Sequence, residues 1–421
     1  MTGFFSFSQD DEFSSGLRPD SFVGHGLIDP HAQGGMVNPA VYRASTVMFR
    51  DMADMEARER QLEAGEEVLW YGRKGTPASF AFARAMAQLE GGYRSLVASS
   101  GLTACVAAIQ AFVQAGDHIL VSDSVYGPTR HFVETVLPRC GVTASFYSPS
   151  IGAGIETLIT DKTRLVYLES PGSMTFEVSD VPVIAAAAHR HGAVVVMDNS
   201  WGTPLFFRAF DHGVDVSVHA ATKYIIGHSD ATMGVITANR ACWDRVRDHA
   251  FAIGLTAGAD DLYLAMRGLR TFPLRMERHS KSGLTVASWL AQRPEIEVVL
   301  HPGLPGAPGH DLWKRDFKGA ASLFSVVFKP CDPAAFRAFV DDLRLFGLGF
   351  SWGGFESLAM PFDPTRSGRG DPWPYQGPGL RLHVGLEAVE DLLMDLDRAF
   401  ALFARMNGAA AADVRSADVA A

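Results

Sequence analysis

Residues 164–198, RLVYLESPGSMTFEVSDVPVIAAAAHRHGAVVVMD, place a helical stretch between two apolar, β-branched runs. The runs RLVYLES (164–170) and AVVVMD (193–198) are typical of strands buried in a parallel sheet. Pro182 near the start and Gly192 at the end of the intervening stretch are helix boundary signals. A strand, a helix and a second strand in this order form a β-α-β crossover, so this stretch predicts an open α/β sheet.

The same alternation continues on both sides of the crossover. HILVSD (118–123) and VDVSVHAAT (214–222) predict two more parallel strands. The pattern from 261 to 293 is helical with a kink or break at Pro273, and we expect this segment to lead out of the sheet domain. A smaller domain is predicted after it, from a strand at 322–328, a helix at 332–346, a strand at 381–387 and a closing helix at 389–406. The long loop 361–379 is a candidate for a functional role.

The composition is that of a globular protein with a large core, since 47% of the 421 residues are hydrophobic and 20% are charged. The formal net charge is −10 and no basic run is present, which argues against a nucleic-acid or anionic-membrane partner. The start of the chain lacks an apolar signal segment, and nowhere do 18 uncharged apolar residues follow one another. We therefore expect a cytoplasmic protein without a membrane span. The four cysteines are scattered and form no C-x-x-C pair, so the sequence predicts neither disulfides nor a metal site.

Polar residues stand at the ends of three predicted strands: Glu169, Asp198 and Lys223. Ligands of open parallel sheets bind beyond the carboxyl ends of the strands, so we expect these residues to meet on one rim. A lysine can form an imine with an aldehyde, and a carboxylate can hold a ring nitrogen protonated. Together they suit pyridoxal 5'-phosphate (PLP). Each residue taken singly is also explained by a turn or a solvated strand end, and it is the combination that favours the cofactor site.

The stretch ASSGL (98–102) leads directly into the apolar helical run TACVAAIQAF (103–112). Small residues at a helix start expose backbone N–H groups to an anion such as a cofactor phosphate, and the helix dipole adds a favourable field. Serine and glycine are also ordinary helix N-caps, so this signal is weak by itself.

Six motifs in collinear order carry a resemblance to a known family. They are YGRKGTPASFAFARAMAQLEGG (71–92), SSGLTA (99–104), ESPGSMTFEVSDVP (169–182), MDNSWGTPLFFRAFDHGVDVSVHAATKYIIGHSD (197–230), SWGGFESL (351–358) and RLHVGLE (381–387). They resemble the PLP-dependent transsulfuration family over about residues 38–406. The resemblance implies the α/β class and an aspartate-aminotransferase-like (type I) PLP fold, with a mainly parallel sheet in the large domain and a smaller C-terminal α/β domain. The expected divisions are an N-terminal segment contacting the neighbouring subunit (1–74), a PLP-binding large domain (75–275), a C-terminal small domain (276–406) and a flexible tail (407–421).

The resemblance also assigns cofactor-binding residues. Lys223 matches the family's Schiff-base lysine, and Asp198 matches the partner of the pyridine nitrogen. Tyr126 matches the tyrosine that stacks on the cofactor ring. The residues that match phosphate contacts are Gly101, Leu102 and Thr222. Lys223 is the implied catalytic base, and Tyr126 is a candidate to assist its proton transfers.

Tyr71 and Arg73 match a pair that reaches the phosphate from a neighbouring subunit. The resemblance therefore implies a homo-oligomer with active sites shared between subunits, which we expect to be a tetramer, with a dimer as the alternative. Tyr71 is a further candidate to assist proton transfer. One departure from the family pattern is Ala220, where many relatives have a serine near the phosphate.

The substrate-binding residues implied by the resemblance are Arg381, Ser351 and Trp352. Arg381 stands where the family binds the substrate α-carboxylate, a task that suits a planar guanidinium able to grip both oxygens. Ser351 and Trp352 match a serine and a tryptophan beside the substrate pocket. A buried core tryptophan is the alternative interpretation of Trp352.

The resemblance is strongest to the family's β-eliminating branch. It implies cleavage of an amino-acid thioether, L-cystathionine, to homocysteine, pyruvate and ammonia in methionine biosynthesis. A broader cysteine or cystine β-lyase stays open, as does a γ-acting relative such as a γ-lyase or an O-acylhomoserine sulfhydrylase. A nucleotide-binding oxidoreductase is disfavoured because no G-x-G-x-x-G follows a strand. A catalytically silent homologue is disfavoured because Lys223, Asp198 and Arg381 are all present.

Overall fold

The computed structural model describes residues 16–363 and 372–419. In this part of the chain seven strands form the larger sheet, in the order β1-β7-β6-β5-β4-β2-β3. They are β1 (Arg94–Ala98), β2 (His118–Ser122), β3 (Thr143–Tyr147), β4 (Thr163–Glu169), β5 (Val194–Asp198), β6 (Val216–Ala220) and β7 (Gly234–Ala238). Strands β3, β2, β4, β5 and β6 are parallel, whereas β7 is antiparallel to β6 and β1. The four strands predicted from the sequence are confirmed, and β1, β3 and β7 complete the sheet.

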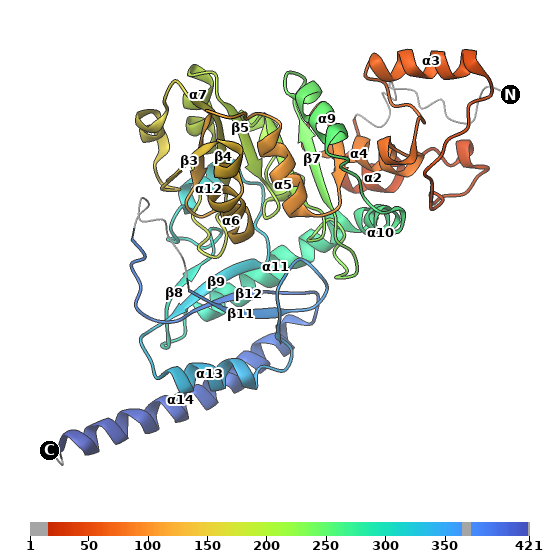
Figure 1. The fold of residues 1–421 in the computed structure, drawn as a ribbon. Coiled ribbons are helices and arrows are strands. Elements are labelled where there is room, and N and C mark those ends of the chain that lie inside the picture. Colours follow the sequence, from red (N-terminus) through yellow and green to blue (C-terminus); the bar gives the residue numbers. More distant parts are fainter. Residues whose placement is uncertain (1–15, 364–371, 420–421) are drawn as a thin grey trace.

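Helices cover both faces of this sheet (Figure 1). They are α4 (Pro77–Glu90), α5 (Gly101–Gln110), α6 (Gly127–Thr135), α7 (Val181–Arg190), α8 (Thr203–Phe206), α9 (Trp243–Ala252) and α10 (Ala259–Arg270). Side chains of β4 alternate between the two faces: Leu165 and Tyr167 belong to the buried cluster that includes residues of α5, α6 and α9, while Val166 and Leu168 belong to the one that includes residues of α4, α7 and α10. Burial on both faces explains why the central strands are continuous apolar runs in the sequence.

Two predictions about helices are confirmed. The crossover predicted from residues 164–198 is present as β4, α7 and β5, with a proline in the first turn of α7. The break predicted at Pro273 separates α10 from α11 (Phe272–Leu290), because Pro273 lies in the first turn of α11. Proline is tolerated there because the first N–H groups of a helix have no partner within the helix.

Within the described residues, five strands form the second sheet, in the order β10-β11-β12-β9-β8. They are β8 (Ile296–Leu300), β9 (Leu323–Phe328), β10 (Gly347–Leu348), β11 (Leu358–Phe362) and β12 (Gly379–His383). The helices of this region are α12 (His310–Asp316), α13 (Pro333–Asp342) and α14 (Val389–Val419). Figure 1 shows α13 and α14 on the side of the sheet that faces away from the larger sheet. Phe328 of β9 packs against Phe339 of α13 and Phe400 of α14, so this region has its own apolar core.

The element boundaries in this region differ from the predictions by several residues. The strand predicted at 381–387 lies at 379–383, and the helix predicted to reach 346 ends at Asp342. Helix α14 continues to Val419 rather than ending near Met406, through most of the predicted flexible tail. Of the candidate functional loop 361–379, residues 364–371 lie outside the described residues. The domain divisions stay a prediction.

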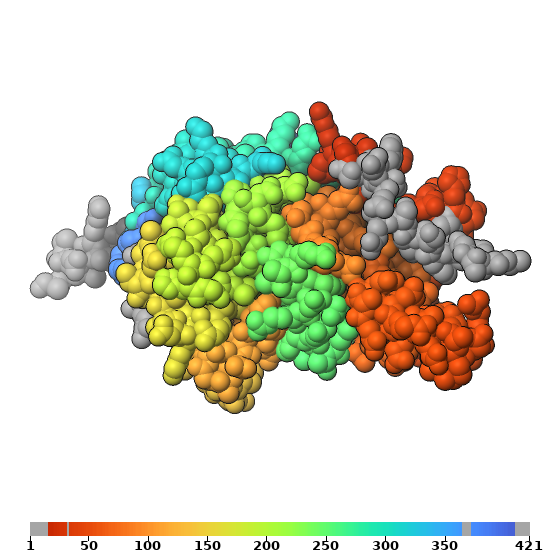
Figure 2. All heavy atoms as spheres, turned by 90° about the horizontal axis from the view of Figure 1, so that it is seen from above, coloured from red at the N-terminus to blue at the C-terminus, as the bar shows by residue number. Residues whose placement is uncertain are grey.

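The N-terminal part of the chain contributes α2 (Pro19–His25) and α3 (Met52–Glu63). No residue of α3 is buried, as its charged sequence predicts. Figure 2 shows this red-to-orange segment gathered at one end of the molecule. Within residues 16–363 and 372–419, five short 3-10 helices connect other elements: η1 (His31–Gln33), η2 (Gly72–Lys74), η3 (Leu137–Cys140), η4 (Gly152–Leu158) and η5 (Ala209–His212). Among the helices of the described residues, none has both the length and the apolar character needed to cross a bilayer.

Candidate active site

The carboxyl ends of β4, β5 and β6 bring the predicted strand-end residues to one rim of the larger sheet. Glu169 of β4 pairs directly with Asp198 of β5, because both are the last residues of neighbouring parallel strands. Lys223 follows β6 by three residues, in a turn where its backbone N–H donates to Ala220 O at 3.0 Å. The sheet topology therefore places two carboxyl groups and one amine at the same edge, as the sequence predicts.

Asp198 is buried and has two contacts that fix its carboxylate. The backbone N–H of Ser200 donates to Oδ1 at 3.0 Å, and the Cys105 thiol donates to Oδ2 at 3.6 Å. Burial and the nearby charge of Asp198 hold the pKa of Cys105 well above its ordinary value, so the thiol keeps the proton that it donates. In the sequence, Cys105 is one of four scattered cysteines. Its position on the apolar face of a helix gave no signal for this contact.

Lys223 lies in a largely enclosed position between the two sheets. Its Nζ donates to Ser351 Oγ at 2.8 Å and lies 5.1 Å from the centre of the Trp352 ring. Burial, followed by the positive charge of Arg381, lowers the pKa of Lys223 to about 8, against the opposing effect of Asp198. A buried lysine with a lowered pKa has more of the neutral amine that attacks an aldehyde.

Tyr126 stands at the mouth of the site, where 41% of its surface is exposed. Its backbone N–H donates to Glu169 Oε2 at 2.7 Å. Burial, followed by the charge of Asp198, holds the pKa of Glu169 well above its ordinary value. Burial also raises the pKa of Tyr126, so its phenol keeps its proton near neutral pH. Glu169 thus holds the backbone at Tyr126. In the sequence, Glu169 was recognisable only as a polar residue at the end of a predicted strand.

The N-terminus of α5 is pressed against the end of β6. A Cβ added to Gly101 would lie 2.5 Å from the Cβ of Ala220, so only glycine permits this approach. The Ser100 hydroxyl accepts from Thr103 N–H at 3.1 Å. Among the described residues, the N–H groups of Gly101 and Leu102 have no hydrogen-bond partner. They are two free donors at a helix N-terminus, which is suited to an anion.

The Thr222 hydroxyl is hydrogen-bonded within the protein. Its Oγ1 donates to Met233 O at 3.1 Å and accepts from Met233 N–H at 2.9 Å. In this arrangement its hydrogen is donated to Met233 O. Ser200, which no sequence motif singled out, contributes a second hydroxyl, whose Oγ accepts from the N–H of Ala220 at 2.7 Å.

Of the predicted substrate-binding residues, Arg381 lies on β12 of the second sheet, and Ser351 and Trp352 lie in the loop between β10 and β11. Nη2 of Arg381, on β12, donates to the carbonyl oxygen of Ser351 at 3.0 Å. Burial lowers the pKa of Arg381 to about 10, so the guanidinium stays charged at neutral pH. The Trp352 ring lies 5.3 Å from the ring of Tyr224 and is partly buried. The structure thus brings Arg381, Ser351 and Trp352 together with Lys223.

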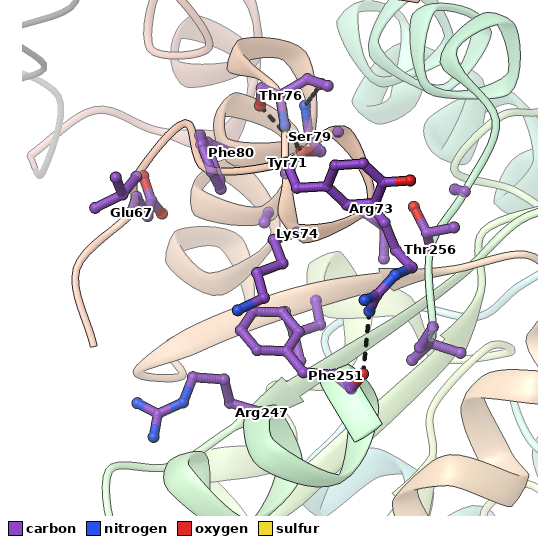
Figure 3. Close-up of a pocket in the computed structure, with 18 of the residues that line it drawn as sticks. Glu67, Tyr71, Arg73, Lys74, Thr76, Ser79, Phe80, Arg247, Phe251 and Thr256 are labelled. Atoms are coloured by element: carbon purple, nitrogen blue, oxygen red, sulfur yellow. Dashed lines mark hydrogen bonds between the residues drawn. The ribbon is translucent and has the colours of Figure 1, made fainter. Parts of the chain in front are cut away.

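Tyr71 and Arg73 lie elsewhere in the chain. They line a cavity of about 350 Å³ between the start of α4, the end of α9 and β1 (Figure 3). Nη1 of Arg73 donates to Phe251 O at 3.1 Å, and the guanidinium lies 5.9 Å from the Tyr71 ring. In the described parts of the chain, no hydrogen bond, ion pair or ring contact joins either residue to Lys223 or Asp198. The residues that line this cavity include none of the rim residues Gly101, Asp198, Thr222 and Lys223.

The residues at the rim fit PLP. A partly neutral lysine amine suits the aldehyde, and the buried Asp198 carboxylate suits a protonated ring nitrogen. The half-exposed Tyr126 ring suits stacking, and the free N–H groups of Gly101 and Leu102 suit the phosphate. In the described residues, no three His, Cys, Asp or Glu side chains are grouped so that they could hold a metal ion.

Comparison with known proteins identifies relatives over almost the whole chain. The Cys/Met metabolism PLP-dependent enzyme family matches residues 22–401. A putative cystathionine beta-lyase of Rhizobium johnstonii is 49% identical over 89% of this chain and 93% of its own. Cystathionine beta-lyase MetC of Escherichia coli is 41% identical over 87% and 94%. The solved structure of metB from Corynebacterium glutamicum superposes with a TM-score of 0.82 at 28% identity, over 92% of this chain and 98% of that one.

Relatives with other named reactions are nearly as similar. An L-alanine/L-glutamate racemase of Wolbachia pipientis is 39% identical over 89% of this chain and 94% of its own. Human cystathionine gamma-lyase is 38% identical over 78% and 82%. Identity over the whole chain therefore does not by itself separate these reactions.

Proposed function

Because the chain belongs to the Cys/Met metabolism PLP-dependent enzyme family, its cofactor is PLP, and we propose that it is a carbon–sulfur β-lyase. The proposed reaction cleaves L-cystathionine to homocysteine, pyruvate and ammonia. The observation that carries the proposal is the position of Trp352, whose ring centre lies 5.1 Å from Lys223 Nζ. An indole beside this amine restricts how the γ-carbon of a substrate can be placed for a second proton abstraction. The relatives named cystathionine beta-lyase support the same reaction.

When bound, PLP supplies an electron-accepting ring that stabilises negative charge at the substrate Cα. In the proposal, Lys223 anchors the cofactor and Asp198 keeps its ring nitrogen protonated. Tyr126 stacks on the ring, held by the bond from its N–H to Glu169. The free N–H groups of Gly101 and Leu102 would donate to the phosphate. The Thr222 hydroxyl would join them by turning its hydrogen from Met233 O to the phosphate. The Cys105 thiol fixes Oδ2 of Asp198.

The substrate α-carboxylate is proposed to bind the Arg381 guanidinium, whose fork can donate two charge-assisted bonds. The bond from Nη2 to Ser351 O orients this fork. Once the substrate amine has taken its place on the cofactor, the freed Lys223 amine would take the proton from Cα, and Ser351 Oγ at 2.8 Å from its Nζ would hold the amine in place. The same amine then gives a proton to the departing thiolate. General base catalysis of this kind contributes about 10²–10⁴-fold to a rate.

Tyr71 and Arg73 are proposed to reach the phosphate of a neighbouring subunit. Support comes from their separation from Lys223 within one chain and from the exposure of Tyr71, of which 42% is open to solvent. The working enzyme is then a homo-oligomer, for which we propose a tetramer in the cytoplasm, acting in methionine biosynthesis. Tyr71 is proposed to assist proton transfer at the shared site.

The test is the keto acid released from L-cystathionine by the PLP-loaded protein. We expect pyruvate with one equivalent of homocysteine, and no product from the Lys223→Ala protein. If the main keto acid is 2-oxobutyrate, the β-lyase proposal is wrong and the enzyme is a γ-lyase. If the protein converts L-alanine or L-glutamate to the D-form and releases no keto acid from L-cystathionine, the β-lyase proposal is wrong and the enzyme is a racemase. Both outcomes leave the family and the cofactor unchanged.

A further inference from the structure

A buried polar cluster lies behind Lys223 and takes no part in the reaction proposed above. It consists of Tyr224, His279, Ser322 and His383, none of which is more than 1% exposed. The Ser322 Oγ lies 3.2 Å from Tyr224 OH, 3.2 Å from His279 Nδ1 and 3.3 Å from His383 Nδ1. Buried polar groups cost free energy unless they are bonded, so such a cluster persists only as a connected network.

This cluster reaches the site through the turn at residues 351–353, which β12 holds at two points. Arg381 and His383 are two residues apart on β12, so their side chains leave the same face of the strand. Arg381 Nη2 donates to Ser351 O at 3.0 Å. His383 Nε2 accepts from the backbone N–H of Gly353 at 3.1 Å. The two bonds fix the carbonyl before Trp352 and the amide after it.

The backbone of this turn needs such support. Ser351 has φ of 78° and Gly353 has φ of 85°, both in the left-handed region, which is unfavourable for a serine. A Cβ on Gly353 would lie 2.7 Å from the nitrogen of Tyr224 and 2.8 Å from the carbonyl carbon of Lys223. The turn therefore packs directly on the backbone that carries the Lys223 side chain.

The proton positions follow from these contacts. His383 can accept from Gly353 only if its Nε2 is unprotonated, which places the ring proton on Nδ1, facing Ser322 Oγ. A proton on Nε2 would face Gly354 O at 3.2 Å and remove the bond from Gly353. Burial, followed by the charge of His279, holds the pKa of His383 well below its ordinary value, so its ring is neutral at pH 7. Ser322 Oγ can accept from this Nδ1–H, so in the tautomer that holds the turn both ring nitrogens of His383 have a partner.

We propose that His383 is a positioning residue that acts through Gly353 to hold Ser351 and Trp352 around Lys223. The proposal rests on the substrate-binding roles given above to Ser351, Trp352 and Arg381. Without the Gly353 bond, Arg381 is the one β12 side chain of the two that still holds the turn, so the Ser351 carbonyl that orients its fork is less firmly placed. The loss should weaken substrate binding more than it slows the chemical step, because the backbone of Lys223 and the carboxylate of Asp198 have contacts outside the turn.

Two substitutions of His383 separate positioning from packing. In His383→Gln the side-chain amide reaches the place of Nε2 and can accept from Gly353, whereas in His383→Asn it reaches only the place of Nδ1. His279→Asn is the matched control, because it alters the same cluster but keeps a donor near Val384 O, the partner of His279 Nδ1 at 3.0 Å. Melting temperatures of the PLP-loaded proteins show that each variant is folded. Ser322→Ala replaces His383→Asn if the latter does not fold.

We measure hydrogen exchange of the peptide that contains Gly353, in the PLP-loaded protein without substrate, together with KM and kcat for L-cystathionine. In His383→Asn we expect about tenfold faster exchange at Gly353 and about tenfold higher KM, with kcat within about threefold. His383→Gln and His279→Asn should stay within about threefold of the wild type in all three. Equal exchange and equal KM in His383→Asn and His279→Asn would overturn the proposal. If the wild type does not cleave L-cystathionine, the proposed function fails, while the exchange result still decides whether His383 holds the turn.

Discussion

Attachment of PLP to Lys223 should follow the ionisation of its amine, because only the neutral amine attacks an aldehyde. Burial and the charge of Arg381 lower the pKa of Lys223 from 10.5 to about 8. At pH 7 the amine is then neutral in about one molecule in ten, compared with about one in 3,000 for a lysine of ordinary pKa. The environment of Lys223 thus makes about 300-fold more reactive amine available at neutral pH.

We expect the rate of PLP uptake by the cofactor-free protein to rise about tenfold per pH unit below pH 8 and to level off above it. The sign follows from the lowered pKa of Lys223, since the neutral form is the majority only above about pH 8. Stopped-flow absorbance with PLP in excess measures the rate. Borohydride reduction and mass spectrometry then identify the attached residue, and the Lys223→Ala protein should yield no adduct there.

Two substitutions of Arg381 test the cause of the lowered pKa of Lys223. Arg381→Gln removes a positive charge that lowers this pKa, so the levelling-off should move to higher pH and uptake at pH 7 should slow. Arg381→Lys keeps the charge and should leave the profile near that of the wild type. A wild-type rate that still rises tenfold per unit above pH 9, or identical profiles for the two variants, would refute this reasoning.

Three other predictions concern the shared site, the phosphate end and the choice of reaction. Mixing inactive Arg73→Ala and Lys223→Ala proteins under subunit exchange should restore about a quarter of wild-type activity, since random pairing makes one intact site in four. If mass spectrometry shows exchange and no activity returns, the site is not shared. Gly101→Ala should weaken PLP binding in an equilibrium titration and lower the free energy of unfolding by about 1–3 kcal/mol in urea, because the added Cβ meets Ala220. The control Gly24→Ala should change neither quantity, since the space around its Cβ is open. Trp352→Ala should raise the share of 2-oxobutyrate formed from L-cystathionine, measured by chromatography, and an unchanged share would remove Trp352 from the control of the reaction.

The sequence predicted the rim of the larger sheet because it depends on local patterns. Strands β4 and β5 end long apolar runs, and β6 alternates valine with Ser217 and His219. Glu169, Asp198 and Lys223 therefore stand out at or just beyond the strand ends. Strands β1 and β3 were missed because partly exposed residues interrupt their apolar pattern. Strand β7 is fully buried, and its five residues GVITA are too short and too rich in small residues to stand out.

Contacts between distant segments could not be predicted in the same way. Cys105 looks like any small apolar residue of α5, and only the packing of α5 on β5 brings its thiol to Asp198. Arg381 and His383 look like two polar residues in an otherwise apolar strand. Only the pairing of β12 with its neighbours turns them toward the two ends of one turn.

By itself, the sequence determined the α/β architecture, the lysine and aspartate candidates for the cofactor site and the family resemblance. Strand periodicity and ordered motifs involve residues that are close together in the sequence, so they can be recognised without the fold. The tertiary structure alone decided how the two sheets meet, with Ser351 and Trp352 set against Lys223. It also decided that Tyr71 and Arg73 lie at another cavity of the same chain. The physical reason is that burial and electrostatic interactions depend on distance in space, so the lowered pKa of Lys223 arises only when residues far apart in sequence pack around its amine.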